Sequence, residues 1–156
     1  CASTTGWAYA APSTVLAWPS QDIELGSLKI ERDGNNIGSL FYHFRAWVQR
    51  MLTLNSVGLI AVEAAEGIRG RAARRILIPL VGIVQELAWA NNVALIEVAP
   101  AAGKAALTGS GVASKSQMIA AARAAGIMTS DPDAADAFGI LTYAVTEWRR
   151  QQGFAS

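Results

Sequence analysis

Two aspartates near the end of the chain have the residue type and spacing of a carboxylate pair that could coordinate a metal ion. Asp131 followed by Pro132 predicts a helix start, because an N-cap acceptor precedes a ring that fixes φ where no N–H is needed. Asp133 and Asp136 are three residues apart, so they would share one face of the first two turns. Acidic residues at a helix start can simply complement the helix dipole, and for Asp131 this explanation suffices.

Asp136 is harder to explain by the dipole alone. It lies beyond the capping turn, among Ala134, Ala135, Ala137 and Phe138. An ionised carboxylate is costly in such surroundings unless something cationic neutralises it. Coordination of a metal ion by facing carboxylates is one solution, and the rest of the chain would then supply the other ligands.

Composition sets the broad class of the protein. The 156 residues are 52% hydrophobic and 16% charged, which predicts a single domain over residues 1–156 with a sizeable core. The formal net charge of +1 does not indicate nucleic acid by itself. The single cysteine excludes an internal disulfide, and no apolar run reaches membrane length. We therefore expect a soluble, cytoplasmic protein without a membrane partner.

The first third of the chain predicts strands followed by a helix. Residues 1–10, 14–18 and 23–30 are rich in β-favouring side chains separated by turn residues, which predicts antiparallel strands. Apolar residues at spacings of three and four over residues 37–52 predict an amphipathic helix. His43 lies beside that apolar stripe without other metal-ligating residues at suitable spacing, which favours packing at the helix boundary over catalysis.

The middle of the chain alternates strand and helix. The apolar run Val57–Glu63 predicts a central strand buried on both faces, and Glu63 would stand at its carboxyl end. Ligands bind at such ends, but a terminal Glu can equally mark where the strand reaches water. Residues 71–90 predict an apolar helix kinked at Pro79, and residues 93–98 predict another strand.

A long passage, Ala99–Lys115, is expected to be irregular. Its Gly109-Ser-Gly111 matches neither the P-loop nor the dinucleotide-binding pattern, so nucleotide binding of those kinds is disfavoured. Ser114 and Gln117 fit a capping box that starts a short helix ending at Gly126. The order of elements predicts an α/β layered domain with a mixed sheet.

Four passages, in the right order and with the right gaps, resemble the RuvC-type Holliday junction resolvases, particularly their bacteriophage-like branch. They are residues 2–8 around Gly6, Val62-Glu63, residues 104–115, and residues 133–137. The resemblance spans nearly the whole chain. It implies a ribonuclease-H-like fold, that is, a mixed β-sheet flanked by helices.

The resemblance also implies a homodimer that cleaves Holliday junctions or other branched DNA by two-metal-ion phosphodiester hydrolysis. The two ions would normally be Mg²⁺, with Mn²⁺ as a possible substitute, held by four carboxylates. Glu63, Asp133 and Asp136 match three of these catalytic metal ligands. Lys104 and Lys115 match the catalytic basic positions, which would hold the phosphate or offset developing charge. Contacts to DNA are predicted for Arg69, Arg71, Arg74, Arg75, Lys104, Gly109, Gly111 and Lys115. For the four arginines this inference rests on charge alone, and keeping that helix end soluble is the alternative.

The chain departs from the family at two places. The family's first acid would stand immediately before Cys1, and the start without Met favours a fragment lacking the beginning of its first strand over a degenerate member. A family aromatic residue at the junction centre is replaced by Glu66, which is unsuited to stacking on bases. A catalytically silent junction-binding protein is therefore an alternative, as is a ribonuclease-H-fold nuclease that acts on hybrids or flaps.

Overall fold

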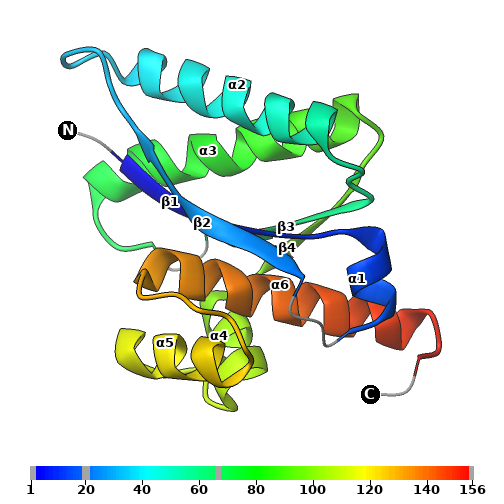
Figure 1. Ribbon diagram of the computed structural model, residues 1–156. Helices are drawn as coiled ribbons and strands as arrows, with labels where there is room; N and C mark the ends of the chain where they lie inside the picture. Colours follow the sequence, from blue (N-terminus) through cyan, green and yellow to red (C-terminus); the bar gives the residue numbers. More distant parts are fainter. Residues whose placement is uncertain (1–2, 19–21, 66–67, 155–156) are drawn as a thin grey trace. The chain divides into compact units, whose positions relative to one another are not determined.

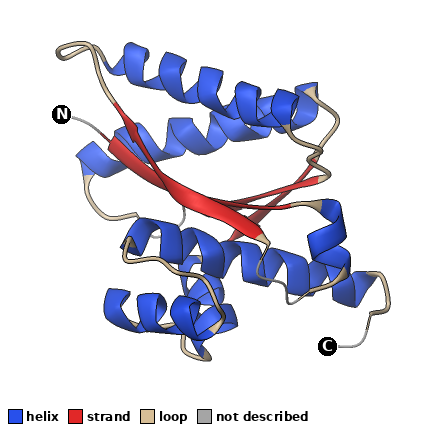
Figure 2. Ribbon diagram, viewed as in Figure 1, coloured by secondary structure: helices blue, strands red, loops and turns tan. Residues whose placement is uncertain are grey.

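The computed structural model describes residues 3–18, 22–65 and 68–154, whose helices and strands are coloured in Figure 2. The chain divides into two compact units. One contains Cys1–Thr4 and Lys29–Glu97, and the other contains Thr5–Leu28 and Val98–Ser156. Across the described residues, no helix combines the length and the hydropathy needed to span a bilayer. The prediction of a single domain stays a prediction.

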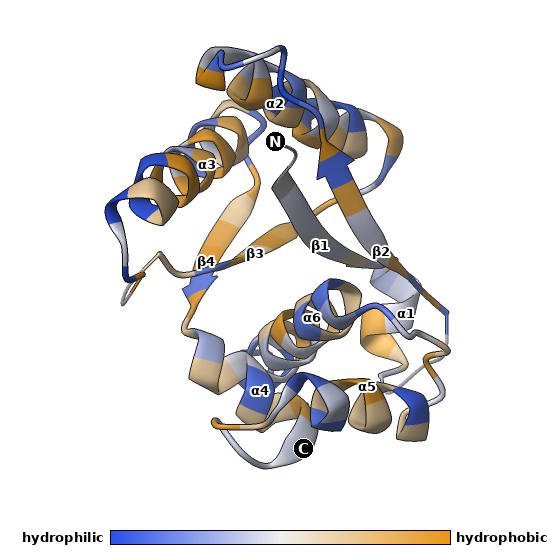
Figure 3. Ribbon diagram, turned by 90° about the vertical axis from the view of Figure 1, so that its left-hand side faces the viewer, coloured by the Kyte–Doolittle hydropathy of each residue, from blue (hydrophilic) through white to orange (hydrophobic). Residues whose placement is uncertain are grey.

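The first unit contains helices α2 (Ile37–Leu54) and α3 (Arg71–Ala90) with strand β3 (Leu59–Glu63) and all but the last residue of strand β4 (Ala94–Val98). β3 pairs with β4, and α3 provides the long crossover that parallel neighbours need (Figure 1). β4 is apolar along most of its length (Figure 3). The side chains of β3 from Leu59 to Val62 are half-buried. The strand itself is confirmed, but the prediction that both of its faces are buried is wrong, because these side chains are only half-buried.

Helix α2 has the predicted amphipathic pattern. Its N-cap Asn36 accepts a hydrogen bond from the backbone N–H of Gly38 at 2.9 Å, and Leu40, Phe44 and Val48 recur every four residues on its buried side. Helices α2 and α3 pack side by side (Figure 1). The buried residues of α3 are Leu80, Val84, Leu87 and Ala88.

The prediction that His43 packs at the helix boundary is wrong. Its side chain is exposed, and its ring meets Tyr42 edge-on with 5.5 Å between ring centroids. His43 immediately precedes the buried Phe44, and one residue turns the side-chain direction by about 100° around a helix. That rotation points the imidazole away from the apolar stripe.

The second unit contains most of strands β1 (Ser3–Ala10) and β2 (Ile23–Ile30), which pair with each other. Its helices are α1 (Pro12–Leu16), α4 (Pro100–Thr108), α5 (Lys115–Ala124) and α6 (Pro132–Gln151). Helix α6 packs against α4 and α5, as Figure 3 shows in a view nearly along its axis.

Two segments of this unit differ from the sequence predictions. Residues 14–18 do not form a strand, because α1 covers residues 12–16, and most of Ala99–Lys115 is not irregular, because α4 covers residues 100–108. Both helices carry proline in their first turn, where its fixed φ and missing N–H are tolerated. The same proline signal that correctly predicted α6 was available for both.

The core of the second unit lies between α5 and α6. Met118 and Ala122 of α5 pack with Ala135 and Phe138 of α6, and all four are at most 3% exposed. Helices α4 and α6 approach closely at a pair of glycines. A Cβ on Gly139 would lie 2.8 Å from the carbonyl oxygen of Gly103, so this crossing has no room for a side chain.

Candidate active site at the start of helix α6

The N-terminus of α6 is capped as predicted. The Oδ1 atom of Asp131 accepts a hydrogen bond from the backbone N–H of Asp133 at 2.9 Å and a longer one from that of Ala134 at 3.5 Å. A hydrogen bond from Ser27 is the largest cause that lowers the pKa of Asp131, and the two backbone N–H groups lower it further against the opposing effect of burial. Asp131 is therefore a stabilised, ionised cap.

Hydrogen bonds from the loop before α6 fix the position of the Asp131 cap. The hydroxyl of Thr129, which is 9% exposed, accepts a hydrogen bond from the backbone N–H of Asp131 at 3.1 Å. The Nε atom of Arg123, at the end of α5, donates to the carbonyl oxygen of Thr129 at 2.9 Å. Ser27, Thr129 and Arg123 thus fix the position of Asp131, and the sequence predictions did not include these three residues.

The backbone of Asp133 is in close contact with strand β1. Gly6 of β1 lies against the backbone of α6, and a Cβ at this position would overlap the carbonyl group of Asp133. Only glycine therefore allows β1 and the first turn of α6 to approach so closely. Gly6 lies inside strand β1, within the range where the sequence predicts a strand.

Asp136 is the electrostatically unusual residue of this site. Its side chain is half-buried, and its Oδ1 atom is buried without a hydrogen-bond partner among the described residues. Burial raises the pKa of Asp136, the positive charges of Lys104 and Lys115 act to lower it, and the nearby Asp133 raises it further. An ionised carboxylate here is stabilised by two positive charges, but the described part of the chain offers no hydrogen-bond donor to one of its oxygens.

The second unit therefore brings together four predicted site residues: Asp133, Asp136, Lys104 and Lys115. Lys104 is half-buried on α4, and Lys115 is the exposed first residue of α5. An acidic pair with an unpartnered oxygen fits a divalent cation that prefers oxygen ligands. The lysines fit a bound phosphate group.

The two predicted glycines have local structural roles. Gly109 ends α4 with φ of 79°, a left-handed conformation that favours glycine, and its N–H donates to the carbonyl oxygen of Ala105. A Cβ on Gly111 would lie 3.1 Å from the carbonyl oxygen of Ala101. Their predicted contact with DNA stays a prediction.

The remaining predicted residues belong to the first unit. Glu63 is the exposed last residue of β3. Arg69 precedes α3, Arg71, Arg74 and Arg75 lie in its first turns, and all four are exposed. Within either unit, no three His, Cys, Asp or Glu side chains among the described residues form a group that could hold a metal ion. Grouping Glu63 with the two aspartates stays a prediction, and Glu66 lies outside the described residues.

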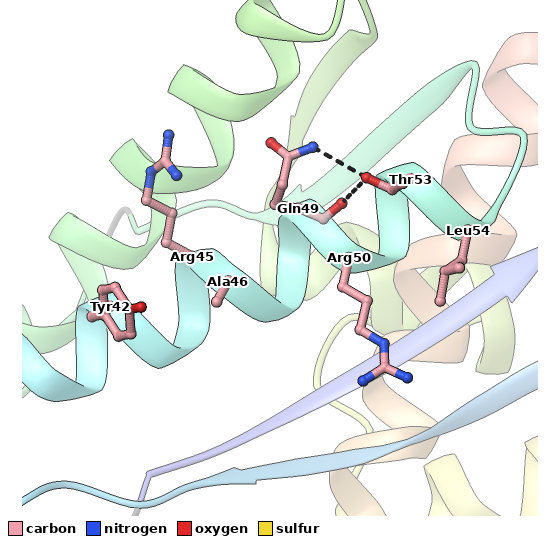
Figure 4. Close-up of a pocket in the computed structure, with 7 residues that line it drawn as sticks. All are labelled: Tyr42, Arg45, Ala46, Gln49, Arg50, Thr53 and Leu54. Carbon is pink, nitrogen blue, oxygen red and sulfur yellow. Dashed lines mark hydrogen bonds between the residues drawn. The ribbon is translucent and has the colours of Figure 1, made fainter.

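A separate shallow hollow of about 510 Å³ runs along one face of α2 (Figure 4). Gln49 and Thr53 are hydrogen-bonded within it, because the Thr53 hydroxyl donates to the Gln49 carbonyl oxygen at 2.9 Å. None of the predicted site residues lines this hollow. Its lining consists of Tyr42, Arg45, Ala46, Gln49, Arg50, Thr53 and Leu54.

Solved structures of RuvC resemble this chain. The structure of Thermus thermophilus RuvC in complex with a Holliday junction substrate is 20% identical, with a TM-score of 0.72, and the match covers 85% of this chain and 83% of that one. This chain has the RuvC fold. A second structure of T. thermophilus RuvC, also 20% identical, has a TM-score of 0.64 over 85% of this chain and 80% of that one. Neither a protein-family model nor a curated protein matches the sequence. The predicted fold class, a mixed β-sheet flanked by helices, is confirmed: the described strands form small sheets flanked by helices in the RuvC arrangement.

Proposed function

We propose that this protein is a divalent-metal-dependent, structure-selective endonuclease that cleaves Holliday junctions or other branched DNA. One observation carries the proposal: Asp136 combines an unpartnered buried oxygen with a neighbouring aspartate and two lysines. The fold supports it, because a protein with the same fold has been solved in complex with a Holliday junction substrate. A fold does not by itself specify an activity, so the proposed activity depends on the residues of the site.

Each residue of the site would have a distinct role. Asp133 and Asp136 would hold divalent cations, and Glu63 would add a further carboxylate. Magnesium, or manganese in its place, supplies Lewis acidity and a more acidic water for phosphodiester hydrolysis. Lys104 and Lys115 would hold the scissile phosphate and offset the negative charge that develops as the bond breaks.

The DNA backbone would be held by the basic residues outside the carboxylate pair. Arg71, Arg74 and Arg75 are exposed on the first turns of α3, and Arg69 is exposed just before it. The Nε atom of Arg74 already donates to the carbonyl oxygen of Ile68 at 2.8 Å, which orients that side chain while leaving its terminal nitrogens available in the guanidinium. Their contribution would be independent of DNA sequence and sensitive to salt.

A homodimer is part of this proposal. A four-way junction has two symmetry-related strands to cut, and a two-fold dimer would present one site to each. Light scattering of the protein alone and with junction DNA would test this. A species of monomer mass with paired nicks would contradict the dimer while leaving the nuclease intact.

The activity is tested by incubating labelled four-way junction and matched linear duplex with the protein and Mg²⁺ or Mn²⁺. We expect paired nicks near the crossover, with 5′-phosphate and 3′-hydroxyl ends, and no nicks with Asp136→Asn or with chelator. Binding without cleavage in either metal would refute the nuclease and leave the silent junction-binding alternative. Faster cleavage of an RNA–DNA hybrid or a flap than of the junction would refute the substrate class.

A further inference from the structure

The segment between the last strand and the final helix has an unusual charge pattern. The chain contains 12 Asp and Glu residues, and none of them lies in residues 98–130. The charged residues of this segment are Lys104, Lys115 and Arg123. The segment forms α4, α5 and their loops, so the second unit carries an acid-free, basic region directly before its carboxylate pair.

Helix α5 turns one side to the core and the other to solvent. Met118 and Ala122 are at most 1% exposed and pack into the core. The exposed side of α5 carries two cations, a hydroxyl, an amide and small side chains, and no acid. Its residues are Lys115, Ser116, Gln117, Ala120, Arg123 and Ala124, which we call the α5 face.

An almost fully exposed apolar side chain stands at each end of the α5 face. Val112 is 91% exposed in the loop before α5, and Met128 is 87% exposed in the loop after it. Met128 is held outward, because its neighbours Ile127 and Thr129 are 5% and 9% exposed and Arg123 donates to the carbonyl oxygen of Thr129. The loop therefore presents this methionine in a defined position.

We propose that the α5 face, with Val112 and Met128 at its ends, binds the sugar–phosphate backbone of one duplex arm of the branched DNA. The inference rests on the proposed function and names the surface that holds the substrate arm. Cations, hydroxyls and amides are the groups that contact DNA phosphates, and small alanines allow a backbone to approach closely. The apolar ends suit contacts with deoxyribose or with bases exposed at a branch.

The position of Lys115 joins this surface to the carboxylate pair. Lys115 is the first residue of α5, and α5 packs against α6, whose first turns carry Asp133 and Asp136. A strand with a phosphate at Asp136 can therefore continue along α5. The ten residues of α5 extend about 15 Å, which corresponds to about four base pairs of duplex. The occupant is DNA backbone, since an acidic ligand complements this surface and a second copy of the same basic face does not.

Charge insertion on the α5 face tests the proposal. Gln117→Glu, Ala120→Glu and Ala124→Glu lie at i, i+3 and i+7, so they form one stripe. Gln117→Glu is the most conservative, because Glu at this position preserves the capping box with Ser114. Gln151→Glu, at the exposed end of α6, is the matched control with the same chemical change.

Binding to labelled four-way junction is measured by fluorescence anisotropy without divalent metal, between 50 and 200 mM salt. We expect each α5 variant to bind about 3- to 10-fold more weakly at 50 mM salt, and Gln151→Glu to bind like the wild type. Each lost phosphate contact should reduce the slope of log K against log salt by about 0.9, so the defect shrinks about 3.5-fold by 200 mM. Circular dichroism checks that the variants are folded.

The outcomes separate this inference from the proposed function. If the wild type cuts the junction and the α5 variants bind it with wild-type affinity and salt slope, the α5 proposal fails and the nuclease stands. If the variants change self-association but not the salt dependence of DNA binding, the face is a protein contact and the proposal also fails. Wild-type protein that neither binds nor cuts branched DNA overturns both.

Discussion

Replacing Asp136 by asparagine should stabilise the metal-free protein while abolishing cleavage. In the wild type, the Oδ1 atom of Asp136 is buried without a hydrogen-bond partner, and burial raises the pKa of the carboxyl. A buried, unsatisfied acceptor costs about 1–3 kcal/mol, and more when it is charged. Lys104 and Lys115 offset part of this cost, but Lys115 is exposed and its effect is screened by solvent and salt.

The magnitude follows from what the substitution removes. Asparagine keeps the shape and the unpartnered oxygen but removes the charge, so we expect a gain of about 1 kcal/mol at neutral pH. For a chain of this size, that corresponds to an increase in Tm of about 2–4 °C. Asp33→Asn is the control, because Asp33 is exposed in a turn and the same chemical change there should leave Tm nearly unchanged.

The pH dependence of unfolding is a second test of whether Asp136→Asn stabilises the protein. Because the folded-state pKa of Asp136 is raised above its ordinary value of 3.8, the folded protein binds more protons than the unfolded chain between these two values. Wild-type stability is therefore lost as the pH rises through this window, and the loss is complete above the folded pKa. The advantage of Asp136→Asn should be largest near pH 7 and should shrink as the pH falls towards 4.

Thermal unfolding followed by circular dichroism in chelator, between pH 4 and pH 7.5, measures this directly. Adding Mg²⁺ should reverse the order, because a ligand that binds only the folded state at ten times its Kd stabilises it by about 1.4 kcal/mol. Only the wild type should gain that stability. A variant that is less stable than the wild type in chelator at pH 7, or a gain that does not change with pH, would refute the reasoning.

Three further substitutions test the supports of the site. Gly6→Ala should lower the free energy of unfolding in urea by about 1–3 kcal/mol, because the added methyl group would overlap the carbonyl group of Asp133. Gly58→Ala is the control and should be neutral, because the space around Gly58 is open. Thr129→Val should cost about 1 kcal/mol through the lost bond to the N–H of Asp131, and Thr129→Ser, which keeps the hydroxyl, should recover most of it. Lys115→Gln should raise the pKa of Asp136 further and move the acid limb of the pH–rate profile to higher pH. Lys29→Gln is the control, and an equal movement with that variant would show that net charge, and not the position of Lys115, causes the change.

The elements that were predicted correctly have local signals. Asp131-Pro132 marks the start of α6, the Ser114–Gln117 capping box marks the start of α5, and Gly126, with φ of 89°, ends the latter. The period of Leu40, Phe44 and Val48 marks the buried side of α2. Each signal involves residues within a few positions of one another, so it can be recognised without knowing the tertiary contacts.

The elements that were missed depend on distant contacts. Helix α4 is rich in alanine and has little amphipathic contrast, and it packs where Gly103 meets Gly139 of α6. Neither glycine by itself predicts that crossing. The contact of Ser27 with Asp131 likewise joins a strand to a helix from the other end of the chain, so the acid could be predicted from sequence but its support could not.

The contrast within the first turns of α6 is the strongest reason to propose a ligand there. Asp131 is satisfied by Ser27 and by backbone N–H groups, and the N–H of Asp133 is satisfied by Asp131. Poor packing would be expected to leave several polar groups unpaired in such a region, but here the Asp131 cap and the N–H of Asp133 are paired, and Ala134 and Ala135, which precede Asp136 in the chain, are buried. Buried polar atoms are nearly always hydrogen-bonded, so one unpartnered carboxylate oxygen in an otherwise satisfied turn requires a specific explanation. A cation that binds together with the phosphate substrate would supply the missing partner, and it explains why two lysines adjoin the aspartates without saturating them.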